Sequence, residues 1–285
     1  MSTTDVSPLP AGEDRYTLLH GLGYHYRDVG ERDAPAVVLL HGLMGHCREW
    51  DILTAALARR FRVLVPDQRG HGRSDRTAAY SAAAMAGDVV ELAERAEVPR
   101  LHLVGHSMGA VIAALVAADH ADLVDRLVLL DVGPDSFASP WARRAFPAML
   151  RALREASYAD ADEAVRDWLV GDPLAREALV RNVVVPNLVP RSDGRLVWRF
   201  DASGLVRFGT EGVTEPRMWR AIERIAAPTL VVRGRYSELL APATAARMLD
   251  RLPHGSLAEI PDAAHDLGVQ QPEAVAAAVL PFLTR

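Results

Sequence analysis

The sequence predicts an α/β fold, with a mostly parallel β-sheet flanked by helices on both faces and a mainly helical insertion. Short apolar runs rich in β-branched residues alternate with Ala- and Leu-rich helical patterns along most of the chain. The runs are almost continuously apolar, which is typical of parallel strands buried on both faces. The alternation stops after Leu130 and resumes near residue 223, which indicates an insertion rather than a barrel.

Each expected strand is a short apolar run, the pattern that favours a buried strand. In chain order the strands are Ala36–Leu40, Arg62–Pro66, Leu101–Gly105, Arg126–Leu130, Thr229–Val232 and Ser256–Ile260. The segments between them are rich in Ala and Leu, which are strong helix formers. The expected helices are Trp50–Arg59, Ser81–Ala96, Ser107–Asp119, Ala243–Leu252 and Glu273–Leu283.

The chain is expected to divide into a tail, a core and a cap. Residues 1–15 are polar and contain Pro and Gly, so we expect a flexible N-terminal tail. Residues 16–133 and 223–285 form the core, and residues 134–222 form the inserted cap. The cap is rich in aromatic residues, which either build its own core or line an apolar pocket. Its expected helices are Trp141–Glu155, Asp162–Leu169 and Leu174–Val183.

Composition excludes several classes of function. The chain has 285 residues with a net charge of -5, and all 32 of its basic residues are Arg. Without lysine there is no Schiff-base or P-loop lysine chemistry, and the charge balance argues against nucleic acid as a partner. The single cysteine, Cys47, cannot form an intrachain disulfide, and the first residues carry no secretory signal pattern, so we expect a cytoplasmic protein.

Residues 101–118 contain no Asp, Glu, Lys or Arg and reach the lower length limit for a membrane span. Gly105, Ser107 and Gly109 interrupt this run in its middle. A buried strand followed by a buried helix explains the same apolarity. We therefore expect no membrane span.

The strongest motif is Gly105-His106-Ser107-Met108-Gly109, which lies between an expected strand and an expected helix. A G-x-S-x-G sequence in this position is the pattern of a nucleophile elbow, where a strained turn projects the Ser hydroxyl above the sheet. The start of the following helix favours negative charge that develops on a bound oxygen. Since parallel strands deliver their ends to one edge of a sheet, residues that follow the later strands lie near this serine. They include Asp131, Glu238 and His265.

Three motifs in this order resemble those of the α/β-hydrolase family. They are His41-Gly42-Leu43-Met44-Gly45, Asp67-Gln68-Arg69-Gly70-His71-Gly72-Arg73-Ser74 and the elbow, and the resemblance runs from about Tyr24 to Arg285. It implies an eight-stranded type of sheet with a cap after the sixth strand. It also implies that the backbone N–H groups of Leu43 and Met108 form the oxyanion hole, and that Gly42 lets its loop approach closely.

A base and an acid are expected at the same edge of the sheet. Only His254 and His265 follow Asp131, and His254 precedes the last strand, at its other end. His265 follows that strand in a loop that resembles the family's P-x-A-x-H pattern, so it is the expected base. The usual acid position of the family holds a serine, which leaves Asp131 or Glu238 as the acid. Asp131 is favoured because Asp131-Val132-Gly133-Pro134 resembles a segment of small bacterial ester and acyl-CoA esterases that take their acid from this strand.

This constellation predicts a cofactor-free serine hydrolase that cleaves a carboxylic ester, thioester or lactone through an acyl-enzyme. A carbon–carbon bond hydrolase and a cofactor-free perhydrolase would use the same triad, and a non-catalytic binding protein is the alternative outside enzymes. The expected partner is a small-molecule acyl substrate, and no metal-ligand spacing is present. Oligomeric state stays open, a homodimer included. The expected substrate-binding residues are Gly42, Met44, Trp141 and Trp168.

Overall fold

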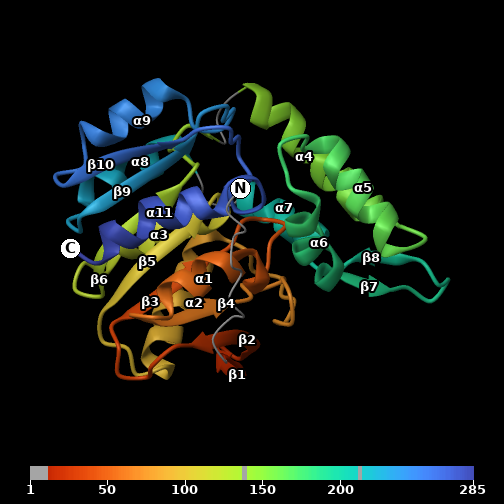
Figure 1. Ribbon diagram of the computed structural model, residues 1–285, viewed down its shortest axis with the longest axis horizontal. Coiled ribbons are helices and arrows are strands. Elements are labelled where there is room, and N and C mark those ends of the chain that lie inside the picture. Colours follow the sequence, from red (N-terminus) through yellow and green to blue (C-terminus); the bar gives the residue numbers. More distant parts are fainter. Residues whose placement is uncertain (1–11, 137–139, 211–213) are drawn as a thin grey trace, which may run out of the picture.

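An eight-stranded β-sheet forms the centre of the computed structural model, which describes residues 12–136, 140–210 and 214–285 (Figure 1). Its strands are β1 (Gly12–Leu19), β2 (Leu22–Val29), β3 (Ala36–Leu40), β4 (Arg62–Pro66), β5 (Leu101–His106), β6 (Val124–Leu130), β9 (Thr229–Gly234) and β10 (Gly255–Ile260). They lie in the order β1-β2-β4-β3-β5-β6-β9-β10. β2 is antiparallel to β1 and β4, and the other neighbouring strands are parallel. The predicted α/β fold with a mostly parallel sheet is confirmed.

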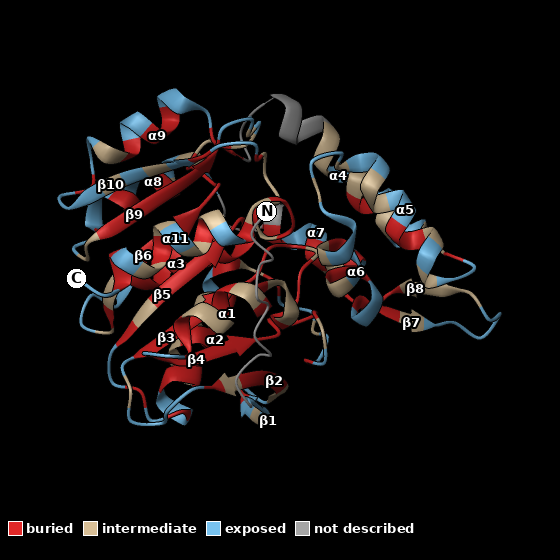
Figure 2. Cartoon of the chain, viewed as in Figure 1, coloured by how far each residue is buried: buried red, intermediate tan, exposed pale blue. Residues whose placement is uncertain are grey.

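Helices cover both faces of the sheet, because apolar side chains leave each central strand in both directions. In β3, Val37 and Leu39 pack on one face, and Val38 and Leu40 pack on the other. Figure 2 shows these central strands almost entirely buried. The first face is covered by α1 (Asp51–Leu57) and α11 (Pro272–Leu283), and the second by α2 (Ala82–Arg95), α3 (Met108–Asp119), α8 (Glu215–Arg224) and α9 (Pro242–Leu249).

The N-terminal hairpin corrects the expected tail. Residues 1–15 were expected to be flexible, but β1 begins at Gly12 and pairs along its whole length with β2. His20 and Gly21, with φ of 48° and 80°, make the tight turn between the strands. β1 is an edge strand with a mostly solvent-exposed surface, so its sequence is polar and lacks the apolar run of a buried strand. Residues 1–11 lie outside the part of the chain that the structure describes.

The helix α8 belongs to the core layer. It packs against α3, although residues up to 222 were expected in the cap. Met218, Trp219 and Ile222 bury one face of α8, while its opposite face is charged. In the described part of the chain the element before α8 is the helix α7 and not a strand of the main sheet, so the strand–helix alternation that reveals the other core helices could not reveal this one.

The insertion between β6 and β9 is mainly helical, as predicted, and lies beyond one end of the sheet (Figure 1). Its elements are α4 (Pro140–Glu155), α5 (Ala161–Gly171), α6 (Glu177–Val184), the 3₁₀ helix η3 (Val185–Asn187), β7 (Leu188–Pro190), β8 (Leu196–Trp198) and α7 (Ala202–Thr210). The indole of Trp198 packs against Tyr158, Trp168 and Phe200, with ring centroids 5.8, 6.1 and 5.7 Å away. Much of the aromatic content of the cap therefore builds its own core.

The apolar run at residues 101–118 forms β5 and α3 at the centre of the fold. None of the helices described is both long and apolar enough to cross a membrane.

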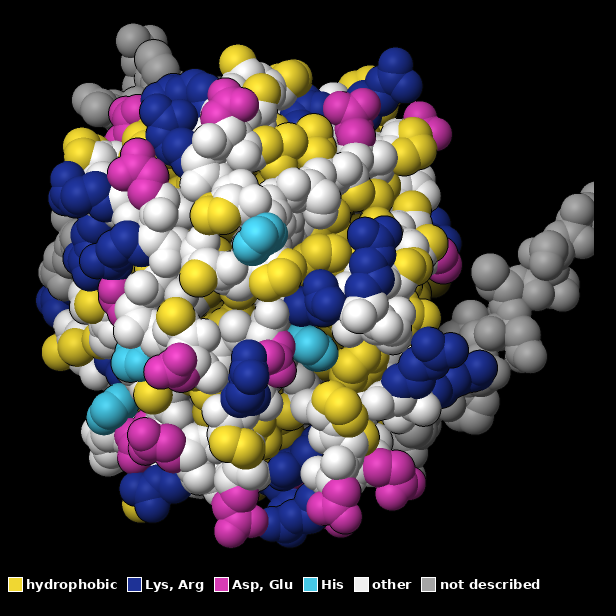
Figure 3. Space-filling model, turned by 90° about the vertical axis from the view of Figure 1, so that its left-hand side faces the viewer, with side chains coloured by type: hydrophobic (Ala, Val, Ile, Leu, Met, Phe, Trp, Pro, Cys, Tyr) yellow, Lys and Arg dark blue, Asp and Glu magenta, His cyan; other side chains and the backbone are white. Residues whose placement is uncertain are grey.

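The face of the molecule in Figure 3 carries Arg and acidic side chains interspersed with apolar ones.

Candidate active site

Ser107 lies in a strained turn between β5 and α3. Its φ of 52° and ψ of -115° are unusual for a residue with a side chain. A Cβ atom at Gly105 would lie 2.3 Å from the Gly109 carbonyl oxygen, and one at Gly109 would lie 2.2 Å from the Leu40 carbonyl oxygen. Both glycines are therefore needed for the strand and helix to approach, and the turn has the geometry that a nucleophile elbow requires.

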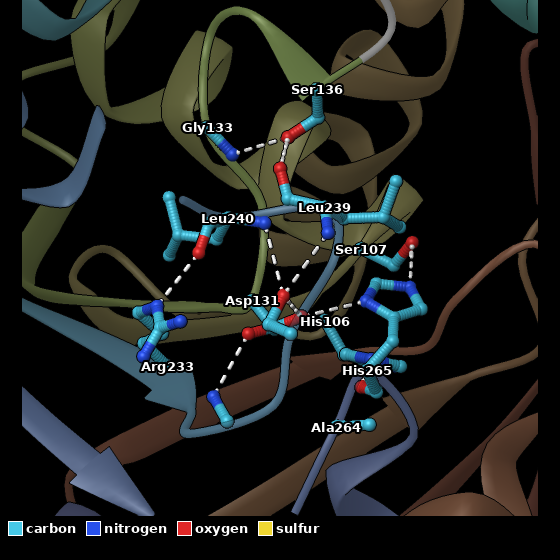
Figure 4. Close-up of polar contacts among 12 residues, drawn as sticks. His106, Ser107, Asp131, Gly133, Ser136, Arg233, Leu239, Leu240, Ala264 and His265 are labelled. Carbon is cyan, nitrogen blue, oxygen red and sulfur yellow. Dashed lines mark hydrogen bonds and ion pairs between the residues drawn. The ribbon is translucent and has the colours of Figure 1, made fainter. Parts of the chain in front are cut away.

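The structure brings His265 and Asp131 to this serine from two other strand ends. His265 follows β10, and its Nε2 lies 2.9 Å from Ser107 Oγ. Its Nδ1 lies 2.9 Å from Asp131 Oδ2. Asp131 follows β6, is fully buried and has a φ of 54°. Figure 4 shows the imidazole between the hydroxyl and the carboxylate, so the three side chains form a continuous hydrogen-bonded row.

Asp131 is held by more than its histidine partner. Its Oδ1 accepts a hydrogen bond from the Gly234 N–H at 2.9 Å, and its Oδ2 accepts one from Ser237 Oγ at 2.6 Å. Ser237 occupies the position where the family usually has its acid, and here it orients the carboxylate instead. Glu238 is exposed and makes no hydrogen bond to His265 among the residues described. Of the two candidate acids, Asp131 has the geometry to orient the imidazole.

The loop after β3 approaches the elbow closely at Gly42. A Cβ atom there would lie 3.5 Å from Ser107 Cβ and 3.1 Å from His106 Nδ1. His71 Nε2 donates to the Leu43 carbonyl oxygen at 2.5 Å, which fixes the peptide plane after Leu43. Met108 begins α3, where backbone N–H groups have no partner within the helix. These positions agree with the expected oxyanion hole, whose role remains a prediction.

An apolar pocket of about 170 Å³ opens beside Ser107. Gly42, Leu43, Met44 and Trp168 line it, as expected for Gly42, Met44 and Trp168. The side chain of Trp141, the other expected cap residue, lies outside the part of the chain whose side chains are described. Sequence reasoning missed further lining residues, which come from α4, α6, α10 (Leu267–Gln270) and the loop after β9. They are Phe146, Met149, Val183, Leu239 and Val269.

Residues 35–272 match the model of the alpha/beta hydrolase fold family. The chain belongs to this family. It is 30% identical to the sn-1-specific diacylglycerol lipase ABHD11 of Mus musculus, over 98% of this chain and 87% of that protein. It is 33% identical to the putative carbamate hydrolase RutD of Caulobacter sp. (strain K31), over 88% of this chain and 91% of that protein. The structure also resembles that of E-2-(acetamidomethylene)succinate hydrolase, with a TM-score of 0.85 over 96% of this chain and 100% of that chain. The two sequences are 24% identical, so this likeness shows the fold alone.

A buried carboxylate beside the row was not foreseen from the sequence of this α/β hydrolase. Glu49 lies in the 3₁₀ helix η1 (Cys47–Trp50), and its Oε1 lies 2.9 Å from His106 Nδ1. Burial alone would lower the pKa of His106, but the hydrogen bond and charge of Glu49 outweigh it and raise the pKa to about 9. Burial alone would raise the pKa of Glu49, but the hydrogen bond and charge of the His106 ring outweigh burial, and the pKa of Glu49 is lowered. Both side chains line the pocket.

Two groups of side chains bring potential metal ligands together among the residues described. In each group, His106 with His265 and Asp266, and His25 with Cys47 and Asp67, the donor atoms lie within 4.8 Å of one another. Hydrogen bonds to protein atoms already engage both ring nitrogens of all three histidines.

The buried Asp67 explains the second group. It binds His25 Nδ1 at 2.7 Å and accepts the Cys47 backbone N–H at 2.8 Å. Burial alone would raise the pKa of Asp67, but these hydrogen bonds hold that pKa well below its usual range. Burial and Asp67 raise the pKa of the Cys47 thiol, so this thiol is poorly suited to reaction as a thiolate. Both groups are therefore accounted for as hydrogen-bond networks.

Proposed function

We propose that this α/β hydrolase is a serine hydrolase that cleaves a carboxylic ester, thioester or lactone through an acyl-enzyme. The observation that carries the proposal is the position of His265, with Nε2 2.9 Å from Ser107 Oγ and Nδ1 2.9 Å from Asp131 Oδ2. This is the arrangement that general-base activation of a serine requires. An acid that follows β6 also agrees with the esterase branch that the sequence resembles, and that branch remains a prediction.

In this mechanism His265 takes the proton of Ser107 Oγ through Nε2 as Oγ attacks the carbonyl carbon. Asp131 accepts the Nδ1–H of His265 and stabilises the imidazolium that forms. The backbone N–H groups of Leu43 and Met108 bind the negative oxygen, and the N-terminus of α3 adds a partial positive charge. His265 then protonates the leaving group and activates the water that releases the acid from Ser107.

The pocket favours a neutral, apolar acyl group. Most of its described lining is apolar, and none of these lining residues is Arg. Glu49 and Asp266 also line the pocket, and the His106 ring is already paired with Glu49, so a substrate carboxylate would meet Asp266 without a free Arg to pair with. The name of the mouse relative, a diacylglycerol lipase, also points to an apolar ester.

A fluorophosphonate probe tests the proposal directly. We expect the probe to modify Ser107, because the neighbouring imidazole activates the hydroxyl, and intact-protein and peptide mass spectrometry locates the adduct. The same preparation is expected to hydrolyse p-nitrophenyl esters from acetate to decanoate. A protein that neither labels nor turns over any of these esters would be a non-catalytic binding protein.

Two further assays separate activities that share the triad. Absorbance measurements on a vinylogous diketone report carbon–carbon bond hydrolysis, and an assay of peracid formation reports perhydrolase activity. We expect ester turnover to exceed both. A higher kcat/KM in either of the other assays would assign the site to that reaction instead.

Trp168→Ala is expected to change the chain-length preference. Trp168 lies on α5 and lines the pocket, so its removal leaves space that a longer acyl chain can fill. We expect kcat/KM for the shortest esters to fall by about tenfold relative to that for decanoate. The measurement is kcat/KM across the p-nitrophenyl ester series.

Val170→Ala is the matched control for this variant. Val170 lies on the same helix but is 82% exposed, so the order of preference among the esters is expected to match the wild type. If Trp168→Ala also keeps the wild-type order, Trp168 does not limit the acyl site.

A further inference from the structure

The His106 ring lies between two groups that can only accept hydrogen bonds. Its Nδ1 is 2.9 Å from the Glu49 carboxylate, and its Nε2 is 2.9 Å from the backbone carbonyl oxygen of His265. A neutral imidazole carries one N–H, and an imidazolium carries two. The lowered pKa of Glu49 keeps its carboxylate ionised, so both contacts can be hydrogen bonds only when the His106 ring is protonated.

Glu49 is built into this position. Its side chain is 10% exposed and that of His106 is 7% exposed, so solvent has little access to the pair. A Cβ atom at Gly45 would lie 2.1 Å from Glu49 Oε2, and one at Gly268 would lie 3.4 Å from Glu49 Cγ. The Glu49 side chain thus fills a space between the loop after β3 and the helix α10, and its carboxylate binds His106, the residue before Ser107.

We propose that Glu49 and His106 form a clamp that positions the catalytic histidine, because the His106 imidazolium holds the backbone of His265 while Glu49 holds the imidazolium. The His265 ring is carried by the backbone that His106 holds, so a shift of that backbone would move Nε2 away from its position 2.9 Å from Ser107 Oγ. This inference rests on the proposed function, and it makes Glu49 and His106 positioning residues for hydrolysis.

The charged groups around His106 favour its protonated form. Glu49 faces it from η1 and Asp266 from the residue before α10, and the His265 backbone carbonyl accepts its Nε2–H. The His265 ring lies beside it, and His41 lies near Glu49, where burial lowers the pKa of His41 to about 3 and keeps its ring neutral. The raised pKa of His106, about 9, means that the ring is charged at neutral pH and loses its proton as the pH rises through about 9. The neutral ring would keep its proton toward the Glu49 carboxylate and lose the bond to the His265 carbonyl.

The identity of residue 49 is therefore expected to control both the rate and its pH dependence. In Glu49→Ala the clamp is absent, and we expect kcat to fall by about 10- to 100-fold with little change in KM. In Glu49→Gln the amide donates to Nδ1 of a neutral ring, whose Nε2–H still donates to the His265 carbonyl. This conservative variant should therefore restore kcat to within about threefold of the wild type and remove the decline of kcat through pH 9.

The experiment compares kcat, KM and the pH profile of the wild type, Glu49→Ala and Glu49→Gln on p-nitrophenyl butyrate. Nitrogen-15 NMR of the histidine side chains reports whether one or both nitrogens of His106 carry a proton at neutral pH. Asp88→Asn is the matched control, since Asp88 forms a buried ion pair with Arg69 at 2.6 Å, away from the residues that line the pocket. It is expected to lower thermal stability while it keeps the wild-type alkaline decline.

Three results would support the clamp: a low kcat in Glu49→Ala, its restoration in Glu49→Gln without the alkaline decline, and two protonated nitrogens on wild-type His106. A wild-type kcat in Glu49→Ala, an unchanged decline in Glu49→Gln, or a neutral wild-type His106 would each overturn it. A wild type that hydrolyses no ester overturns the proposed function. In that case the NMR spectrum still tests the proposed clamp, because it reports the protonation of the His106 nitrogens without any enzyme assay.

Discussion

Ser107→Ala should reduce ester hydrolysis by about 10⁴- to 10⁶-fold in kcat, because the variant has no oxygen to attack the substrate carbonyl. The oxyanion hole and the pocket are left in place, so some hydrolysis above the rate in water is expected to remain. The folded state should be kept, since alanine is nearly the same size as serine and the residue is buried in the turn. The measurements are kcat/KM on p-nitrophenyl butyrate, probe labelling and the thermal unfolding midpoint.

The matched control for this variant is Ser256→Ala. Ser256 lies in β10 and is part-buried, but it takes no part in the row of Ser107, His265 and Asp131. We expect its activity to stay within about twofold of the wild type. Equal rates for Ser107→Ala and the wild type would show that another group carries out the reaction, and the proposed function would then be wrong.

Asp131→Asn should lower kcat by about 10³- to 10⁴-fold. The carboxylate accepts the Nδ1–H of His265, and this keeps Nε2 free to take the proton of Ser107. An amide in its place can donate to Nδ1, which favours the wrong tautomer and removes the charge that stabilises the imidazolium. The measurement is kcat/KM across pH, together with thermal unfolding, because Asp131 is fully buried and also binds Gly234 and Ser237.

Glu238→Gln provides the comparison for Asp131→Asn. Glu238 is exposed, so its loss of charge is expected to change kcat by less than about twofold. The opposite pattern, with a harmless Asp131→Asn and an inactive Glu238→Gln, would reassign the acid to Glu238 and require the loop after β9 to move.

The strands at the centre of the sheet could be predicted because their signal is local. β3, β4 and β5 are continuous apolar runs, and such runs have few stable environments other than a sheet covered on both faces. The hairpin of β1 and β2 could not be predicted in this way. β1 is an edge strand with a mostly exposed surface, and β2 is buried but carries the polar residues His25 and Arg27, whose partners come from distant segments. The helix α8 was placed in the cap because its buried face is recognised only once α3 lies against it.

The residues of the candidate site likewise fall into those that the sequence predicted and those that only the structure revealed. Ser107 was visible because its flanking glycines are required by the turn in which it lies, and His265 was visible because it follows a strand in a family-like pattern. The contact of Ser237 with Asp131 joins residues 106 positions apart, and that of Glu49 with His106 joins residues 57 positions apart. Neither the serine three residues after β9 nor the glutamate in η1 has a local sequence feature that predicts its partner.

The residues alone were enough to predict the α/β class, the strained turn at Ser107 and the set of side chains that meet at one edge of the sheet. Steric limits on the backbone and the direction of apolar side chains act over a few residues, so they leave a mark in the sequence. The folded chain was needed to choose between Asp131 and Glu238 by geometry, to line the pocket with Phe146, Met149 and Val183, and to pair Glu49 with His106. These features depend on strand register and on how the cap helices turn against the core, which are set by the packing of the whole molecule.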